Sequence, residues 1–148
     1  MAFIGASLSH VDHQLLPVNV PTLVQLNRTL WDFGGLVKNG TIIIPQGMGG
    51  IYHCIATATF EKGTIGIRNL YIDVLGDGAM GVAEQRSNDL ITILACQVYK
   101  RLEPGQTVAL YATSSDGRRL LGGRQNLDPL IELDGDYSPR LTVVRVGE

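Results

Sequence analysis

The sequence has little charge, few aromatic residues and only two cysteines among 148 residues. Charged residues make up 18% of the chain, and 12 Lys and Arg nearly balance 14 Asp and Glu, so the net charge is −2. This balance excludes a broad electrostatic attraction to nucleic acid or to an anionic membrane. No apolar run approaches the ~20 residues of a membrane span, and the first residues lack the pattern of a signal peptide. Cys54 and Cys96 are too few for a disulfide scaffold. We expect two buried free thiols, with a single bridge as the alternative.

What the chain does contain is glycine and short apolar segments. Eighteen Gly, a hydrophobic fraction of 45% and many Val, Ile and Thr favour strands joined by tight turns over helices. The length suits one domain, residues 1–148, with a core of its own. Asn39-Gly40 is a strong hairpin signal, and about eight to ten strands follow one another at short intervals. The pattern predicts an all-β protein, a two-sheet antiparallel sandwich or jelly roll.

The clearest predicted strand covers residues 50–60, GIYHCIATATF, where side chains alternate between two faces. The predicted core face holds Tyr52, Cys54, Ala56, Ala58 and Phe60. The opposite face holds Ile51, His53, Ile55, Thr57 and Thr59. Because the opposite face still carries two isoleucines, we expect it to be covered, either by another chain or by the second sheet of the same sandwich.

Residues 76–81, GDGAMG, match the glycine spacing of a dinucleotide-binding loop. That loop requires a helix opening at its last glycine and a parallel strand afterwards. Only five residues, VAEQR, separate Gly81 from the breaking sequence Ser-Asn-Asp, which is too short for the crossover. We therefore predict that Asp77-Gly78 forms a turn and that no nucleotide cofactor binds here.

Several motifs occur in an order that resembles one known family. Leu26 stands at a position that is aromatic in that family, Asp32 follows at its acidic position, and Ile44 takes a later aromatic position. GIYHC at residues 50–54 takes the place of the family's G-x-Y-x-F. Downstream, LEPGQTV at residues 102–108 and the strand after it match the family's turn and next strand. The end, residues 138–141, departs from the Phe-rich closing strand of animal members.

The chain in this way resembles the complement-1q-like and tumour-necrosis-factor-like jelly-roll family over nearly its whole length. The resemblance implies a ten-stranded jelly-roll sandwich that assembles as a homotrimer about a threefold axis, a symmetry that soluble homo-oligomers use. The candidate trimer-interface residues are Ile51, His53, Ile55, Ala95 and Tyr111.

The sequence favours ordinary loop and hairpin residues over a metal site or a catalytic site. His10 and His13 have metal-like spacing, but zinc requires four convergent ligands, and we expect ordinary loop histidines. Asp134 and Asp136 flank a glycine, and some members of the resembled family bind calcium at the trimer apex. Calcium prefers six to eight oxygens, so a D-G hairpin with solvated acids is the favoured reading. No nucleophile motif occurs, and we expect neither enzymatic activity, a metal nor a cofactor.

Arg118, Arg119 and Arg124 form the one basic concentration in the sequence. They are candidates for binding a phosphate group, an acidic glycan or an acidic neighbouring subunit. Asp116 and Asp128 flank them, so a locally paired surface loop is the alternative.

Two functions fit a lone trimeric jelly roll. Animal members suggest a receptor-binding or secreted ligand, but those carry a signal peptide, anchor or stalk. A virion protein that assembles in the host cytoplasm needs none of these. We therefore expect a non-enzymatic structural protein, namely a phage virion component such as a capsid decoration protein that binds itself and the major capsid protein. A receptor- or glycan-binding head of a tail fibre, or a secreted ligand, is the alternative.

Overall fold

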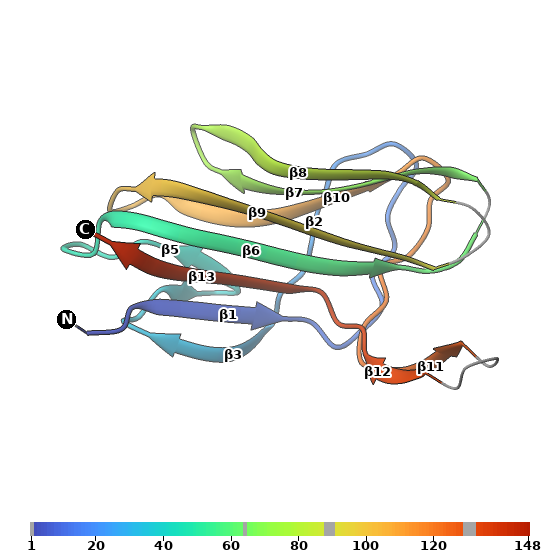
Figure 1. Cartoon of the computed structure of the whole chain (residues 1–148), viewed down its shortest axis with the longest axis horizontal. Coiled ribbons are helices and arrows are strands. Elements are labelled where there is room, and N and C mark those ends of the chain that lie inside the picture. The colour runs from blue at the N-terminus through green and yellow to red at the C-terminus, as the bar shows by residue number, and fades with distance from the viewer. Residues whose placement is uncertain (1, 64, 88–90, 129–132) are drawn as a thin grey trace.

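The computed structural model describes residues 2–63, 65–87, 91–128 and 133–148, but not the side chains of residue 87 or residues 124–135. All regular elements in this part of the chain are β-strands (Figure 1). The strands are β1 (Gly5–Ser9), β2 (Thr22–Leu23), β3 (Arg28–Phe33), β4 (Val37–Lys38), β5 (Thr41–Ile43), β6 (Gly50–Phe60), β7 (Gly66–Val74), β8 (Gly78–Ser87), β9 (Thr92–Leu102), β10 (Thr107–Ser114), β11 (Arg124–Asp128), β12 (Leu133–Asp136) and β13 (Arg140–Gly147).

The strands form two facing antiparallel sheets and one separate hairpin. Sheet A has the order β3-β1-β13-β6-β9. Sheet B has the order β4-β5-β10-β7-β8, with β2 paired to β10, and β11 pairs with β12. The first and last strands, β1 and β13, lie side by side, and both chain ends emerge at the same end of the sandwich (Figure 1). The predicted all-β, two-sheet jelly roll is confirmed.

The core lies between the two sheets and is filled by alternate residues of each strand. On β10 every second residue from Val108 to Ser114 is buried, and the intervening residues face outward. The bulkiest apolar members are Tyr52 and Phe60, both fully buried. The Tyr52 hydroxyl donates a hydrogen bond to the Met48 carbonyl oxygen at 2.6 Å, so its polar end is satisfied.

The two predicted faces of β6 are confirmed. Tyr52, Cys54, Ala56, Ala58 and Phe60 are all buried, as expected of a core face. Thr59 lies on the opposite face, paired with Ile93, yet it is only 3% exposed. The reason is that the backbone N–H of Leu121 donates to the Thr59 carbonyl, and Leu120 bridges to Phe60, so the chain around residues 120–121 covers this end of the strand.

The glycine-rich stretch is the β7–β8 hairpin, which confirms the predicted turn. Gly76 and Gly78 have φ values of 92° and 88°, and the Asp77 N–H donates to the Val74 carbonyl. A strand, β8, follows where a dinucleotide loop needs a helix. The last glycine of the pattern, Gly81, has another role: a Cβ added there would lie 2.7 Å from the Gln97 carbonyl oxygen. Its missing side chain lets β8 approach β9 at the edge of the sandwich.

The stretch from residue 22 to residue 33 forms two strands that belong to different sheets. β2 pairs with β10 in sheet B, whereas β3 pairs with β1 in sheet A. Residues 24–27 cross between the sheets, and Val24 and Leu26 are buried as they do so. Asp32 then caps the turn after β3, because its two carboxylate oxygens accept the backbone N–H groups of Leu36 at 2.9 Å and Val37 at 3.1 Å. This gives the acidic position of the motif a structural role.

Both cysteines are free and buried on the inner side of sheet A, as expected. Burial raises the pKa of the Cys54 thiol to about 12 and that of Cys96 to about 11. Because the thiolate is the reactive form, we predict that neither thiol reacts with a disulfide reagent near pH 8 while the protein is folded. Two thiols should be released per chain in denaturant. Colorimetric thiol titration with and without denaturant measures this, and one or two rapidly reacting thiols in the native protein would contradict the burial.

One ion pair is buried at the end of sheet B. The Arg68 side chain is fully buried, and its Nη1 lies 2.9 Å from Oδ1 of Asp116, whose side chain is 12% exposed. Asp116 also accepts hydrogen bonds from the Ser114 hydroxyl at 2.7 Å and from Nε of Arg118 at 3.0 Å. The pair ties β7 to the turn that follows β10.

No helix in the described residues is long and apolar enough to cross a membrane.

Candidate interaction surface

The most distinctive surface of the described chain is the side of sheet A that faces away from sheet B, here called the outer face of sheet A. It follows from alternation, since every second side chain of β6, β9 and β13 points away from the core. In the centre of this face, β6 contributes Ile51, His53, Ile55 and Thr57, β9 contributes Ile93, Ala95, Gln97 and Tyr99, and β13 contributes Thr142 and Val144.

Several large side chains on this face are exposed in the single chain. Ile51 is 37% exposed, Ile55 36%, Ile93 55% and Tyr99 64%. The alternative in which the second sheet of the same chain covers this face is therefore wrong, because sheet B packs against the opposite side of sheet A. The remaining expectation, cover by another chain, is not tested by a single chain.

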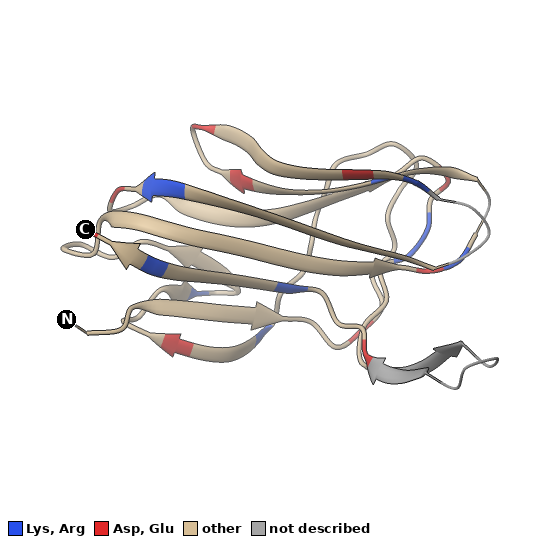
Figure 2. Cartoon of the chain, viewed as in Figure 1, with Lys and Arg blue, Asp and Glu red and all other residues tan. Residues whose placement is uncertain are grey.

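The centre of the outer face carries no charged side chain. Along its pairing with β6, β9 places Arg101 opposite Ile51, and β13 places Arg140 opposite Thr57, so the basic groups lie at the two ends. Figure 2 shows β6 and the middle of β9 without blue or red segments. Depletion of charge with retention of aromatic and aliphatic groups is typical of the centre of a protein interface.

His53 lies in this uncharged centre and is held by β9. Its ring stacks on Tyr99, with centroids 4.4 Å apart and planes 12° from parallel. The Nε2–H of His53 donates to Oε1 of Gln97, and the two atoms lie 2.8 Å apart. The three side chains form one contiguous group across two strands.

Ile55 stands between two hollows. One, of about 280 Å³, is lined on the β13 side by Thr57, Arg140 and Thr142, together with Asp136 and Ser138. The other, of about 260 Å³, lies toward β8 and is lined by Gly81, Val82, Ala95, Cys96 and Gln97. A ridge between hollows can interdigitate with side chains of a second surface.

Three aromatic rings extend this face along its β3 edge. Phe3, Trp31 and Phe33 pack on one another with ring centroids 5.5–5.8 Å apart. Phe3 and Phe33 are more than half exposed. These three aromatic residues are not among the candidates predicted from the sequence, although the alternation of Trp31 and Phe33 within one strand indicates a shared face.

Ala95 lies on the outer face of sheet A with Ile51, His53 and Ile55, but Tyr111 does not. Tyr111 belongs to β10 and stacks on Tyr71 across β7, with centroids 5.6 Å apart, on the outside of sheet B. Its assignment to one interface with the other four residues is therefore corrected. Alternation showed that Tyr111 points away from the core but could not show which sheet contains it.

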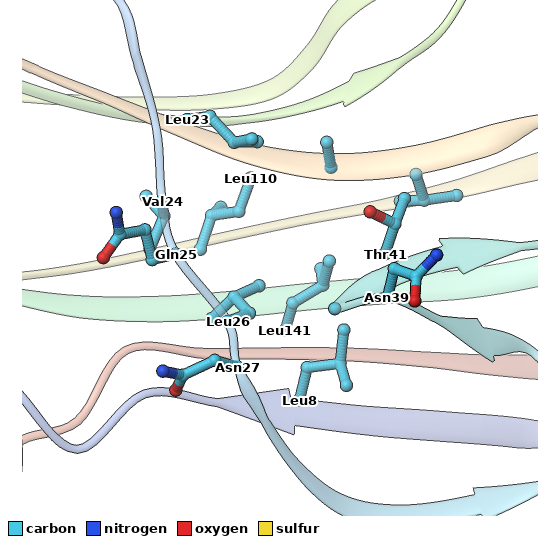
Figure 3. A pocket seen from close by; sticks show the side chains of 13 residues that line it. Leu8, Leu23, Val24, Gln25, Leu26, Asn27, Asn39, Thr41, Leu110 and Leu141 are labelled. Atoms are coloured by element: carbon cyan, nitrogen blue, oxygen red, sulfur yellow. The ribbon is translucent and has the colours of Figure 1, made fainter.

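A third hollow opens between the sheets where residues 24–27 cross the edge of the sandwich (Figure 3). Its volume is about 240 Å³, and Gln25, Asn27, Asn39 and Thr41 form its rim. The leucines behind the rim, Leu8, Leu110 and Leu141, are at most 1% exposed. Because these leucines are already closed to solvent by their neighbours, a ligand in the hollow would contact little of their apolar area.

Two of the three candidate partner-binding arginines are engaged within the chain. Arg118 pairs with Asp116 at 3.0 Å, as the locally paired alternative expected. Arg119 donates from Nε and Nη2 to Glu61 at 3.0 and 2.9 Å. Burial alone would raise the pKa of the Glu61 carboxyl, but these hydrogen bonds and the Arg119 charge outweigh it and lower that pKa. The Arg124 side chain lies outside the described residues.

His10 and His13, which lie outside the outer face of sheet A, each form a hydrogen bond within the chain. His10 is buried and its Nδ1–H donates to Oδ1 of Asn27 at 2.6 Å, while Nδ1 of His13 accepts the Gly122 N–H at 3.1 Å. Ser138 hydrogen-bonds Asp136 and lowers the pKa of its carboxyl. The Asp134 side chain lies outside the described residues, so the calcium reading is not tested. Among the described side chains, no group of three or more His, Cys, Asp or Glu is arranged to hold a metal.

Comparison with known proteins rests on structure, because no family model and no curated protein matches the sequence. The globular domain of zebrafish complement 1qA protein superposes with a TM-score of 0.63. The match covers 97% of this chain and 97% of that one, at 12% sequence identity. At this identity the likeness defines the fold alone. The chain therefore has the two-sheet jelly-roll fold of the complement-1q globular domain.

Proposed function

We propose that this protein is a non-enzymatic binding module that works as a homotrimer, with copies in contact through the outer face of sheet A. The observation that carries the proposal is the uncharged, apolar centre of that face. A soluble monomer rarely leaves such a patch open to water, because burying apolar area contributes about 25 cal/mol per Å².

The number of copies is proposed from the fold. The complement-1q-like family that the chain resembles assembles as threefold trimers, and closed point symmetry limits how many copies can hide a given face. The Ile55 ridge and its flanking hollows supply the relief that such packing needs. Function then consists of binding through surfaces that remain outside the trimer.

For the partner, we propose a surface with local threefold symmetry, of which a phage capsid built from the major capsid protein is the specific candidate. A trimer matches such a site with all three copies in equivalent contact. A receptor- or glycan-binding head, on a tail fibre or as a secreted ligand, remains the alternative function.

The trimer is tested by measuring mass in solution. Sedimentation equilibrium of the purified chain is expected to give three times the 16.0 kDa of one chain across a dilution series. A single species of one chain mass at all concentrations would overturn the proposal. Co-sedimentation with phage heads, compared with glycan-array binding, then separates the capsid role from the ligand-head role.

A further inference from the structure

A histidine occupies the centre of the proposed contact surface, where it can make association depend on pH. We infer that protonation of His53 weakens the association of copies through the outer face of sheet A, so that the assembly loosens in mild acid. The inference rests on the proposed trimer and adds a regulatory property to it.

The first step concerns the groups around His53. On its own strand the outward neighbours are Ile51 and Ile55, and on β13 the residue opposite is Val144. On β9 the residue opposite is Tyr99, beside Gln97. None of these side chains carries a negative charge that could compensate an imidazolium.

The charged groups of this face lie toward its ends and are of both signs. Arg101 lies two residues beyond Tyr99 on β9, opposite Ile51, and its Nη2 donates to the backbone carbonyl of Glu148. Arg140 lies on β13 opposite Thr57, and Asp136 lines the same hollow as Arg140 and Ile55. The Glu148 carboxylate, whose side chain is 70% exposed, lies 3.6 Å from Arg145. None of these charged groups lies opposite His53 in the strand pairing, so none supplies a compensating negative charge to its ring.

The second step concerns the hydrogen bonds of the ring. In the described structure Nε2 is used by Gln97, and Nδ1 has no protein partner. In the single chain His53 is partly exposed, so water can solvate Nδ1 and its proton. A second copy laid over an apolar surface removes that water, and a charged group without a partner is far more costly to bury than a neutral one.

These two steps give the sign of the effect. Histidine is the side chain whose charge ordinarily changes between pH 5 and 8. If assembly favours the neutral ring, each copy must release a proton on joining in acid, and association weakens as the pH falls. Because a trimer contains three copies of His53, its association depends more steeply on pH than one histidine alone would make it.

The experiment compares the wild type with His53→Gln at about pH 7.5 and about pH 5.5 by sedimentation velocity over a dilution series. For the wild type, we expect the midpoint concentration of association to rise by on the order of tenfold or more at the lower pH. The variant keeps a polar amide, cannot be protonated, and should associate equally at both values. His10 and His13 remain in the variant, so it also controls for the other histidines. Circular dichroism confirms that both proteins are folded.

Each outcome decides between the two proposals. Association of both proteins with no pH effect overturns the histidine inference and leaves the trimer intact. Tighter wild-type association in acid also overturns it, and would indicate that a carboxylate of the second copy, such as Glu84 on the β8 edge, meets the ring. Equal pH dependence in the variant assigns the effect to other groups. Monomers at about pH 7.5 for both proteins would reject the trimer itself. His53→Leu is expected to associate at both pH values, which keeps the test decisive if the glutamine variant folds poorly.

Discussion

Asp116→Ala is expected to lower the free energy of unfolding by about 3–5 kcal/mol. The change removes the carboxylate that lies 2.9 Å from Nη1 of Arg68, whose side chain is fully buried. A guanidinium cannot lose its charge at accessible pH, so the variant must bury a cation without that partner or open the end of the sheet to water. Chemical denaturation monitored by tryptophan fluorescence measures the loss.

Two further variants identify burial of charge as the cause. Asp77→Ala removes an aspartate from an ion pair of similar length, 3.0 Å from Lys100, but both side chains are partly exposed, so little change is expected. The double variant Arg68→Met/Asp116→Leu removes both charges together and should recover much of the lost stability, since matched apolar groups often replace a buried pair well. Equal losses for Asp116→Ala and Asp77→Ala would contradict the explanation.

Ile55→Lys is expected to abolish trimer formation at concentrations where the wild type is associated. Ile55 forms the ridge between the two hollows on the outer face of sheet A, so a second copy must bury whatever stands there. An unpaired ammonium in a contact costs about 3 kcal/mol or more, which corresponds to weakening of at least a hundredfold. Sedimentation velocity over a dilution series measures this weakening of association.

Ile67→Lys is the matched control. Ile67 is the same residue type with a similar exposure, 41% against 36%, but it lies in β7 and points away from the core on the outside of sheet B. Its substitution should leave the trimer unchanged. If Ile67→Lys dissociates the protein and Ile55→Lys does not, the copies associate through sheet B and the proposed surface is wrong.

The features that the sequence predicted well are those fixed by neighbours along the chain. Asn39 and Gly40 have φ values of 51° and 73°, as the hairpin signal requires, and the Gly76–Gly81 stretch is a turn and a strand. Alternation along residues 50–60 separated the core side from the outward side correctly, and only the cover over Thr59 by the chain around residues 120–121 was missed. In each case the preference depends on residues a few positions apart.

The features that could not be predicted from the sequence depend on which distant strands are paired. Arg119 was matched with acids nearby in sequence, whereas its partner is Glu61, 58 positions away. Tyr111 and Ile55 both alternate outward, yet they lie on different sheets. The aromatic group of Phe3, Trp31 and Phe33 forms because β3 pairs with β1, which brings the start of the chain beside the third strand.

By itself, the amino-acid sequence determined that the chain forms strands with one apolar side each, where several of the turns occur, and that the segment 50–60 has a second apolar side. The tertiary structure decided which strands lie in which sheet, and with that the surface on which Ile55, His53 and Tyr99 meet. The physical reason is that side-chain alternation and turn preferences act locally. The outer face of sheet A is assembled by hydrogen bonds between strands far apart in the sequence, whose order no single strand specifies.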